Sequence, residues 1–96
     1  MIVLVAYDIA SDQRRELVSA RLSGCGARVQ LSLFECDLKD DSELSLLVAS
    51  LKEMIDEIDD QIRIYLLSAT GHGEEHPPTN VLGRRTIEER RDFWII

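Results

Sequence analysis

The sequence lacks the features that mark several common protein classes. No apolar run approaches the roughly 18 residues that a membrane-spanning helix requires, and no basic segment precedes the apolar N-terminus as in a secretory signal peptide. The sequence also contains no glycine-rich phosphate loop and no GxGxxG, GxSxG or HExxH motif, the signatures of several nucleotide-binding and hydrolytic enzymes. A length of 96 residues predicts a single domain. Because no signal peptide is recognised, a cytoplasmic location is expected.

Cysteine and histidine are too few to build an obvious metal centre. The two cysteines, Cys25 and Cys36, lack CxxC spacing, which favours free thiols over a disulfide or a metal site. The two histidines, His72 and His76, fall in the Gly/Pro-rich segment 69–83. Two imidazoles without cysteine are a weak zinc signal, so a solvated loop is the expectation there.

The net charge of −7 is concentrated in one segment. Residues 37–60 hold nine acidic residues, and their only bases are Lys39 and Lys52, the two lysines of the chain. The nine other bases are arginines, six of them in the adjacent pairs 14–15, 84–85 and 90–91. Because a guanidinium group can bind two phosphate oxygens at once, these pairs fit a nucleic-acid backbone as well as ordinary helix-surface charge. The acidic segment could receive a basic protein partner.

Hydrophobic periodicity predicts a strand and then a helix in the first quarter of the chain. Residues 2–6 form a continuous apolar, β-branched run that ends at Tyr7-Asp8-Ile9, typical of a central strand buried on both faces. Ser11 or Asp12 can cap the helix that follows, and glycines at 24 and 26 end it. Its apolar stripe at helical spacing consists of Leu17, Val18, Leu22 and Cys25.

The rest of the chain predicts two strands, a helix and another strand. Residues 27–38 alternate with period two, and a tight turn near Ser32 would divide them into two short strands. Residues 42–59 read as an amphipathic helix with an acidic outer face, and residues 61–67 as a strand. The apolar tail 93–96 is expected to add to a sheet edge, its own or a partner's.

This order predicts an α+β, ferredoxin-like βαββαβ sandwich with an extra C-terminal strand. Residues 1–68 would form the core, and residues 69–96 the loop and the tail strand that completes a dimer. Two helices on one face leave the other face of the sheet open. Val3, Val5 and their neighbours would then meet water, so a face-to-face homodimer is expected.

The sequence closely resembles the CRISPR-associated Cas-two family, the small subunit of the spacer-acquisition module. The likeness covers the first 67 residues and rests on Tyr7-Asp8-Ile9, Asp12, Arg14-Arg15 and Gly26-x-Arg28-Val29-Gln30-x-Ser32-x-Phe34-Glu35-x-x-Leu38. Leu82-Gly83-Arg84-Arg85-Thr86 resembles the family less specifically. The resemblance implies a ferredoxin-like homodimer with a terminal strand in the partner's sheet. It also implies the CRISPR integrase subunit as partner and, in several members, magnesium-dependent cleavage of RNA or DNA.

The resemblance also implies roles for individual residues. Asp8 matches the catalytic, metal-binding aspartate, with Mg²⁺ or alternatively Mn²⁺ as the cation. On its own, a carboxylate that ends a strand suits either a hard cation or a turn, and a two-fold axis would place two copies across one cleft. Contacts to the nucleic-acid backbone are implied for Arg14, Arg15, Arg84 and Arg85, with Arg28 near Asp8. Tyr7, Ser32 and Phe34 would support the site, although packing or turn formation would equally explain them.

The expected function is that of a CRISPR adaptation protein. Such a dimer would bind prespacer DNA or single-stranded RNA, bridge integrase subunits and hydrolyse phosphodiester bonds as a metal-dependent endonuclease or endoribonuclease. A purely architectural, non-catalytic DNA-binding subunit is one alternative. A toxin-type endoribonuclease of the VapD kind is another, and a regulatory domain for a small effector is a third.

Overall fold

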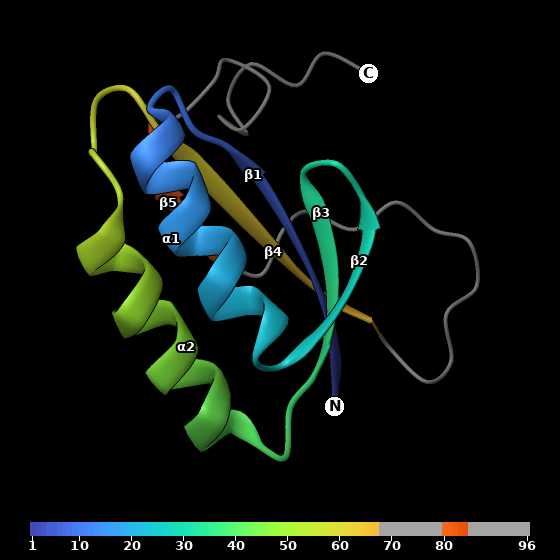
Figure 1. The fold of residues 1–96 in the computed structure, drawn as a ribbon. Helices are drawn as coiled ribbons and strands as arrows, with labels where there is room; N and C mark the ends of the chain where they lie inside the picture. Colours follow the sequence, from blue (N-terminus) through green and yellow to red (C-terminus); the bar gives the residue numbers. More distant parts are fainter. Residues whose placement is uncertain (68–79, 85–96) are drawn as a thin grey trace, which may run out of the picture.

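The computed structural model describes residues 1–67 and 80–84, which form one antiparallel sheet with two helices on one of its faces (Figure 1). The sheet order is β2-β3-β1-β4-β5, so the first four strands have the predicted ferredoxin-like arrangement. The elements, in chain order, are β1 (Ile2–Asp8), α1 (Asp12–Ser23), β2 (Gly26–Gln30), β3 (Leu33–Asp37), α2 (Asp41–Met54), β4 (Gln61–Leu67) and β5 (Asn80–Gly83). No helix within these residues is long and apolar enough to cross a membrane.

The central strand β1 is buried on one face only, so the expectation of burial on both faces was wrong. Val3, Val5 and Tyr7 point toward the helices and are buried, whereas Ile2 and Leu4 point the other way and remain partly exposed. The prediction that Val3 and Val5 would meet water was therefore also wrong. Both helices lie on the same face of the sheet (Figure 1), and strand alternation places every second β1 side chain beneath them.

The helix α1 begins where the sequence predicts. Ser11 is its N-cap, and the side chain of Ser11 accepts a hydrogen bond from the backbone N–H of Arg14. Gly24 is the C-cap, and Val18 and Leu22 are the buried residues of the helix. Leu17, expected in the same stripe, is 51% exposed. The buried stripe is therefore narrower than the predicted one.

The hairpin of β2 and β3 confirms the turn predicted near Ser32. Gln30 pairs with Leu33, and a bulge interrupts the register between Arg28 and Gln30. The Ser32 carbonyl accepts a hydrogen bond from the backbone N–H of Tyr7 at 3.0 Å. The turn is thus anchored to the central strand.

The helix α2 ends at Met54, five residues before the predicted end at residue 59. The carboxylate of Asp56 accepts hydrogen bonds from the backbone N–H groups of Ile58 and Asp59, and so forms a turn in place of another helical turn. Ile58, which lies inside the predicted helix 42–59, is consequently outside α2 and 81% exposed. Helical periodicity alone did not reveal this competing side-chain bond.

The strand β5 lies inside the segment 69–83, so the prediction of a loop was wrong for Asn80–Gly83. It pairs with β4 at the edge of the sheet, with Gln61 opposite Gly83. Gly83 has φ +81°, and a Cβ there would lie 2.3 Å from the Asp60 carbonyl oxygen. His72, His76, Arg85 and the tail 93–96 lie outside the described residues.

Candidate functional site

The Asp8 carboxylate lies at the end of β1 and is bonded to a residue 76 positions further along the chain. Nη2 of Arg84 donates to Oδ2 of Asp8 at 2.7 Å. Both side chains are accessible, with 74% of Asp8 and 40% of Arg84 exposed. The structure thus brings together two of the predicted site residues, a carboxylate and a guanidinium group, at the accessible end of the sheet where β1 ends.

The backbone of Arg84 is held by two neighbours from β4 and the turn before it. The Arg84 N–H donates to the Asp60 carbonyl at 2.7 Å, and Nε2 of Gln61 donates to the Arg84 carbonyl at 2.6 Å. Gln61 is the register partner of Asp8 on one side and of Gly83 on the other. The end of β5 therefore lies one strand away from the end of β1, across Gln61, and the long Arg84 side chain spans this distance to Asp8.

A fully buried carboxylate, Asp60, connects several segments at this end of the sheet, and the sequence analysis did not identify it. Its oxygens accept hydrogen bonds from the backbone N–H groups of Ala10 at 2.9 Å and Asp56 at 2.8 Å. Asp60 was counted only as one of the acids of the segment 37–60. The available signal was its position immediately before a buried strand, where a charged residue is rarely left without partners.

The side chain of Arg14 completes the set of partners around Asp60. Nε of Arg14 donates to Oδ2 at 2.6 Å, and Nη2 donates to Oδ1 at 3.2 Å. Burial alone raises the pKa of Asp60, but the hydrogen bonds from Arg14, Asp56 and Ala10 outweigh burial and bring the pKa to about 2. The same hydrogen bond to Asp60 raises the pKa of Arg14. The guanidinium group of Arg14, which was predicted to contact phosphate, is thus bonded to the carboxylate of Asp60.

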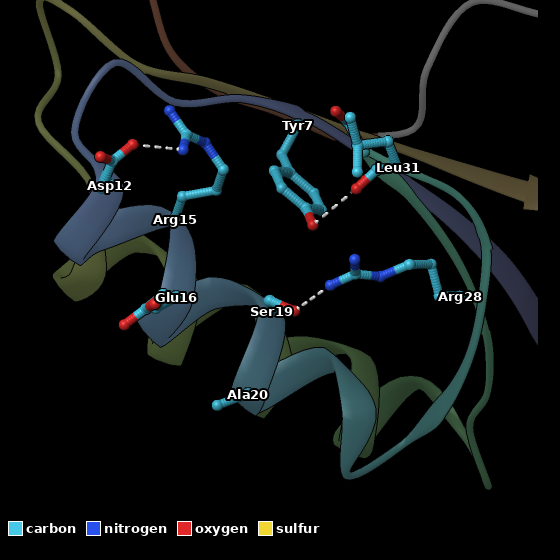
Figure 2. A pocket seen from close by; sticks show the side chains of 9 residues that line it. Tyr7, Asp12, Arg15, Glu16, Ser19, Ala20, Arg28 and Leu31 are labelled. Carbon is cyan, nitrogen blue, oxygen red and sulfur yellow. Dashed lines mark hydrogen bonds and ion pairs between the residues drawn. The ribbon is translucent and has the colours of Figure 1, made fainter.

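Arg15 and Arg28 lie on the helix side of the sheet, around a hollow of about 560 Å³ between α1 and the β2–β3 hairpin (Figure 2). Arg15 bonds to the Asp12 carboxylate at 2.5 Å and to the Ile9 carbonyl at 3.1 Å. Arg28 donates to the Ser19 hydroxyl at 2.5 Å. The hollow is lined by Tyr7, Asp12, Arg15, Glu16, Ser19, Ala20, Arg28, Leu31 and Ser32.

The aromatic residues of the predicted site fix the wall of this hollow. The Tyr7 hydroxyl donates to the Leu31 carbonyl at 3.2 Å (Figure 2), and the Tyr7 and Phe34 rings stack at a centroid distance of 6.2 Å. The Arg28 guanidinium lies 5.3 Å from the centroid of the Phe34 ring, within cation–π range. Tyr7 and Phe34 are buried packing residues, and the Phe34 ring also contacts the Arg28 guanidinium group.

Apart from Arg14, the predicted site residues that the structure describes therefore fall into two groups on opposite faces of the sheet. Tyr7 and Asp8 are consecutive in β1, and strand alternation directs their side chains to opposite faces. Asp8 and Arg84 form one group, while the residues around the hollow form the other.

The metal-binding capacity of the described residues is small. They contain no group of three or more His, Cys, Asp and Glu side chains placed to hold an ion. Asp8 supplies one carboxylate, which fits Mg²⁺ because this ion keeps several waters and commonly takes one or two protein carboxylates. Asp8 would thus hold a largely hydrated cation.

The sheet order, the two helices on one face and the carboxylate at the end of β1 define a small ferredoxin-like α+β protein. The family described as CRISPR associated protein Cas2 matches residues 1–74. The chain belongs to this family, as its resemblance in sequence indicated. The match decides against the toxin-type alternative.

Curated relatives and solved structures agree with this assignment. The chain is 41% identical, over the full length of both proteins, to CRISPR-associated endoribonuclease Cas2 1 of Chloroflexus aurantiacus. It is 44% identical to CRISPR-associated endonuclease Cas2 2 of Thermus thermophilus, over 96% of this chain and 92% of that protein. The crystal structure of Streptococcus pyogenes Cas2 at pH 6.5 is 36% identical, with a TM-score of 0.67 over 73% of this chain and 89% of that one.

Proposed function

We propose that this chain is a cytoplasmic CRISPR adaptation protein that dimerises, binds nucleic-acid backbone and cleaves phosphodiester bonds with the help of a divalent cation. The observation that carries the proposal is the accessible Asp8–Arg84 pair, a carboxylate for a hard cation beside a guanidinium group for a phosphate. The relatives named as endoribonuclease and endonuclease support this class of reaction.

Asp8 and Arg84 have different roles when substrate binds. Bound Mg²⁺ would supply an activated water and offset the charge that develops on the scissile phosphate. Asp8 would hold the hydrated cation through its carboxylate. Arg84 turns from Asp8 to a phosphate oxygen, so its positive charge remains paired while the carboxylate is released.

The arginines around the hollow extend the contact along the backbone. Arg28 is exposed, and half of Arg15 is accessible, so each can exchange an internal partner for a phosphate. Arg14 acts indirectly, because its fork is bonded to Asp60 and positions the first turn of α1. Arg85 follows Arg84 in the sequence and is proposed as a further backbone contact.

A homodimer is proposed through the sheet face that no described helix covers. Ile2, Leu4 and Tyr65 contribute apolar, partly exposed side chains to this face. Packing two such faces would bury apolar surface and relate two Asp8 residues by a two-fold axis. Leu4→Lys is expected to shift the mass measured by sedimentation from dimer to monomer, whereas Leu46→Lys on the outer face of α2 leaves it unchanged.

The cleavage proposal is tested with single-stranded RNA and duplex DNA as substrates. Wild-type protein is expected to cleave at least one of them in Mg²⁺ or Mn²⁺ and neither in EDTA, while Asp8→Asn retains binding and loses cleavage. Glu53→Gln, an exposed change on α2, is the control for lost negative charge. Full cation-dependent cleavage by Asp8→Asn would overturn the assignment of Asp8.

A second function, that of an architectural bridge between integrase subunits, is supported by the acidic outer surface near α2. Exposed acids such as Glu53 and Glu57 can face a basic partner, whereas Asp56 is committed to its turn. The architectural proposal predicts that charge reversal at Arg84 and Arg85 abolishes retention of prespacer DNA, while Asp8→Ala leaves spacer integration intact. It fails if Glu53→Gln with Glu57→Gln leaves integrase binding unchanged and charge reversal at the two arginines has no effect.

A further inference from the structure

The two cysteine thiols meet outside the proposed site, where α1, β2 and β3 converge. Cys25 lies between the C-cap of α1 and the start of β2, and Cys36 lies in β3. Their Sγ atoms are 2.9 Å apart, and Cys25 Sγ also donates to the Leu22 carbonyl at 3.4 Å. No other cysteine occurs in the chain.

The backbone, rather than the flexibility of the thiols, brings the two sulfur atoms together. A Cβ on Gly26 would lie 1.9 Å from the Glu35 carbonyl oxygen and 2.7 Å from the Cys36 Cα. Only glycine therefore permits β2 and β3 to approach this closely at that position. The Cys25 carbonyl accepts a hydrogen bond from the backbone N–H of Asp37 at 3.1 Å. Forming a covalent bond requires the sulfur atoms, now 2.9 Å apart, to approach by only about 0.9 Å.

The two thiols differ in accessibility, which assigns them different roles. Cys36 is fully buried, and burial, aided by the hydrogen bond with Cys25, raises its pKa to about 12. Cys25 is partly exposed. A small oxidant therefore meets Cys25 first, and Cys36 remains a protonated thiol in contact with it.

We propose that Cys25 and Cys36 form a reversible intrachain disulfide when the protein meets a peroxide. The Cys25 thiolate attacks one peroxide oxygen, the O–O bond breaks, and Cys25 becomes a sulfenic acid. The Cys36 sulfur then attacks the Cys25 sulfur, and hydroxide leaves with the proton of Cys36 as water. The two sulfur atoms lose two electrons in total, and hydrogen peroxide is reduced to two molecules of water.

The bond would close a ring around the β2–β3 hairpin and tie it to the end of α1. This hairpin carries Arg28, which lines the hollow, and Phe34, whose ring contacts the Arg28 guanidinium group. A ring of this size removes conformational entropy from the unfolded chain. Oxidation is therefore expected to stabilise the hairpin without altering the Asp8–Arg84 edge.

The test exposes the full-length wild-type protein to hydrogen peroxide and maps its cysteines by mass spectrometry without reduction. We expect one cross-linked species within a single chain, lighter by two hydrogen atoms, and loss of both of the two titratable thiols. The thermal midpoint should rise by at least about 5 °C and return to its original value after reduction with dithiothreitol.

Cys25→Ser is the matched variant, since Cys25 is the less buried partner and the substitution spares the core. This variant should show no peroxide-induced rise in thermal midpoint and no internal cross-link. The proposal is overturned if wild-type Cys25 accumulates as sulfinic or sulfonic acid while Cys36 stays reduced. It is equally overturned if the cross-links join different chains.

Discussion

Two arginine–aspartate pairs lie at the same end of the sheet and differ in burial and in hydrogen bonding. Asp60 is fully buried and accepts four hydrogen bonds, two from Arg14 and two from backbone N–H groups. Asp8 is 74% exposed and accepts one bond from Arg84. The first pair is saturated, whereas the second can exchange its partners at little cost.

Burial accounts for this difference. A buried carboxylate that loses a partner leaves uncompensated polar groups, and such losses are strongly destabilising. An exposed ion pair is screened by water and salt and contributes roughly 0–1 kcal/mol. The buried pair Arg14–Asp60 thus stabilises this end of the sheet, whereas the exposed pair Arg84–Asp8 forms an accessible candidate site there.

The largest effect is expected when the buried carboxylate is removed. Asp60→Ala leaves Arg14 and the N–H groups of Ala10 and Asp56 without their acceptor and should lower the free energy of unfolding by about 3 kcal/mol. Urea unfolding followed by circular dichroism measures this loss. Asp59→Ala, an exposed neighbour, should change stability by less than about 0.5 kcal/mol. Equal effects of the two changes would show that Asp60 is not the organising residue.

The contribution of Asp60 should also depend on pH in a defined direction. Its pKa in the folded protein is about 2, below the ordinary value of 3.8, so its stabilisation is present above about pH 4 and is lost as the pH falls through 2. Urea midpoints of wild type and Asp60→Asn should therefore converge between pH 5 and about pH 2. A stability difference that stayed constant over this range would contradict the assigned pKa.

A smaller effect is expected from exchanging arginine for lysine in each pair. Arg14→Lys keeps the charge but loses the two-atom fork, so it should lower stability, though less than Asp60→Ala does. Arg84→Lys, at the exposed pair, should leave stability unchanged. The urea midpoints of the two variants measure the contrast directly. If Arg84→Lys proved the more destabilising, the ranking of the two pairs would be reversed.

Much of the fold could be predicted because its signals are local. The alternation of residues 27–38, the Ser11 cap and the strand at 61–67 each follow from neighbouring residues, and the structure confirms them. The four residues Asn80–Gly83 carry no such signal, because they become a strand only by pairing with β4. Likewise, the early end of α2 depends on a side-chain bond from Asp56 that no periodicity reveals.

The candidate site was predictable residue by residue but not as an arrangement. The sequence indicated Asp8 and Arg84 separately, yet their pairing depends on β5 returning to the edge of β4. It also grouped Arg14 with Arg15, although their guanidinium groups have different partners. Neither their spacing nor their charge distinguishes an arginine bonded to a buried carboxylate from one beside an open hollow.

The exposed pair should respond to substitution in cation affinity rather than in stability. Arg84→Gln frees the Asp8 carboxylate, so Mn²⁺ should bind about twofold to fivefold more tightly, and the gain should shrink at high salt because the pair is screened. Water-proton relaxation with Mn²⁺ measures the affinity, and urea unfolding should differ from wild type by less than about 0.5 kcal/mol. Arg21→Gln removes the same charge in the last turn of α1. It controls for the general loss of electrostatic repulsion between the protein and the cation. If both variants bind Mn²⁺ equally well, Arg84 does not compete with the cation for Asp8, and the proposed exchange of partners is wrong.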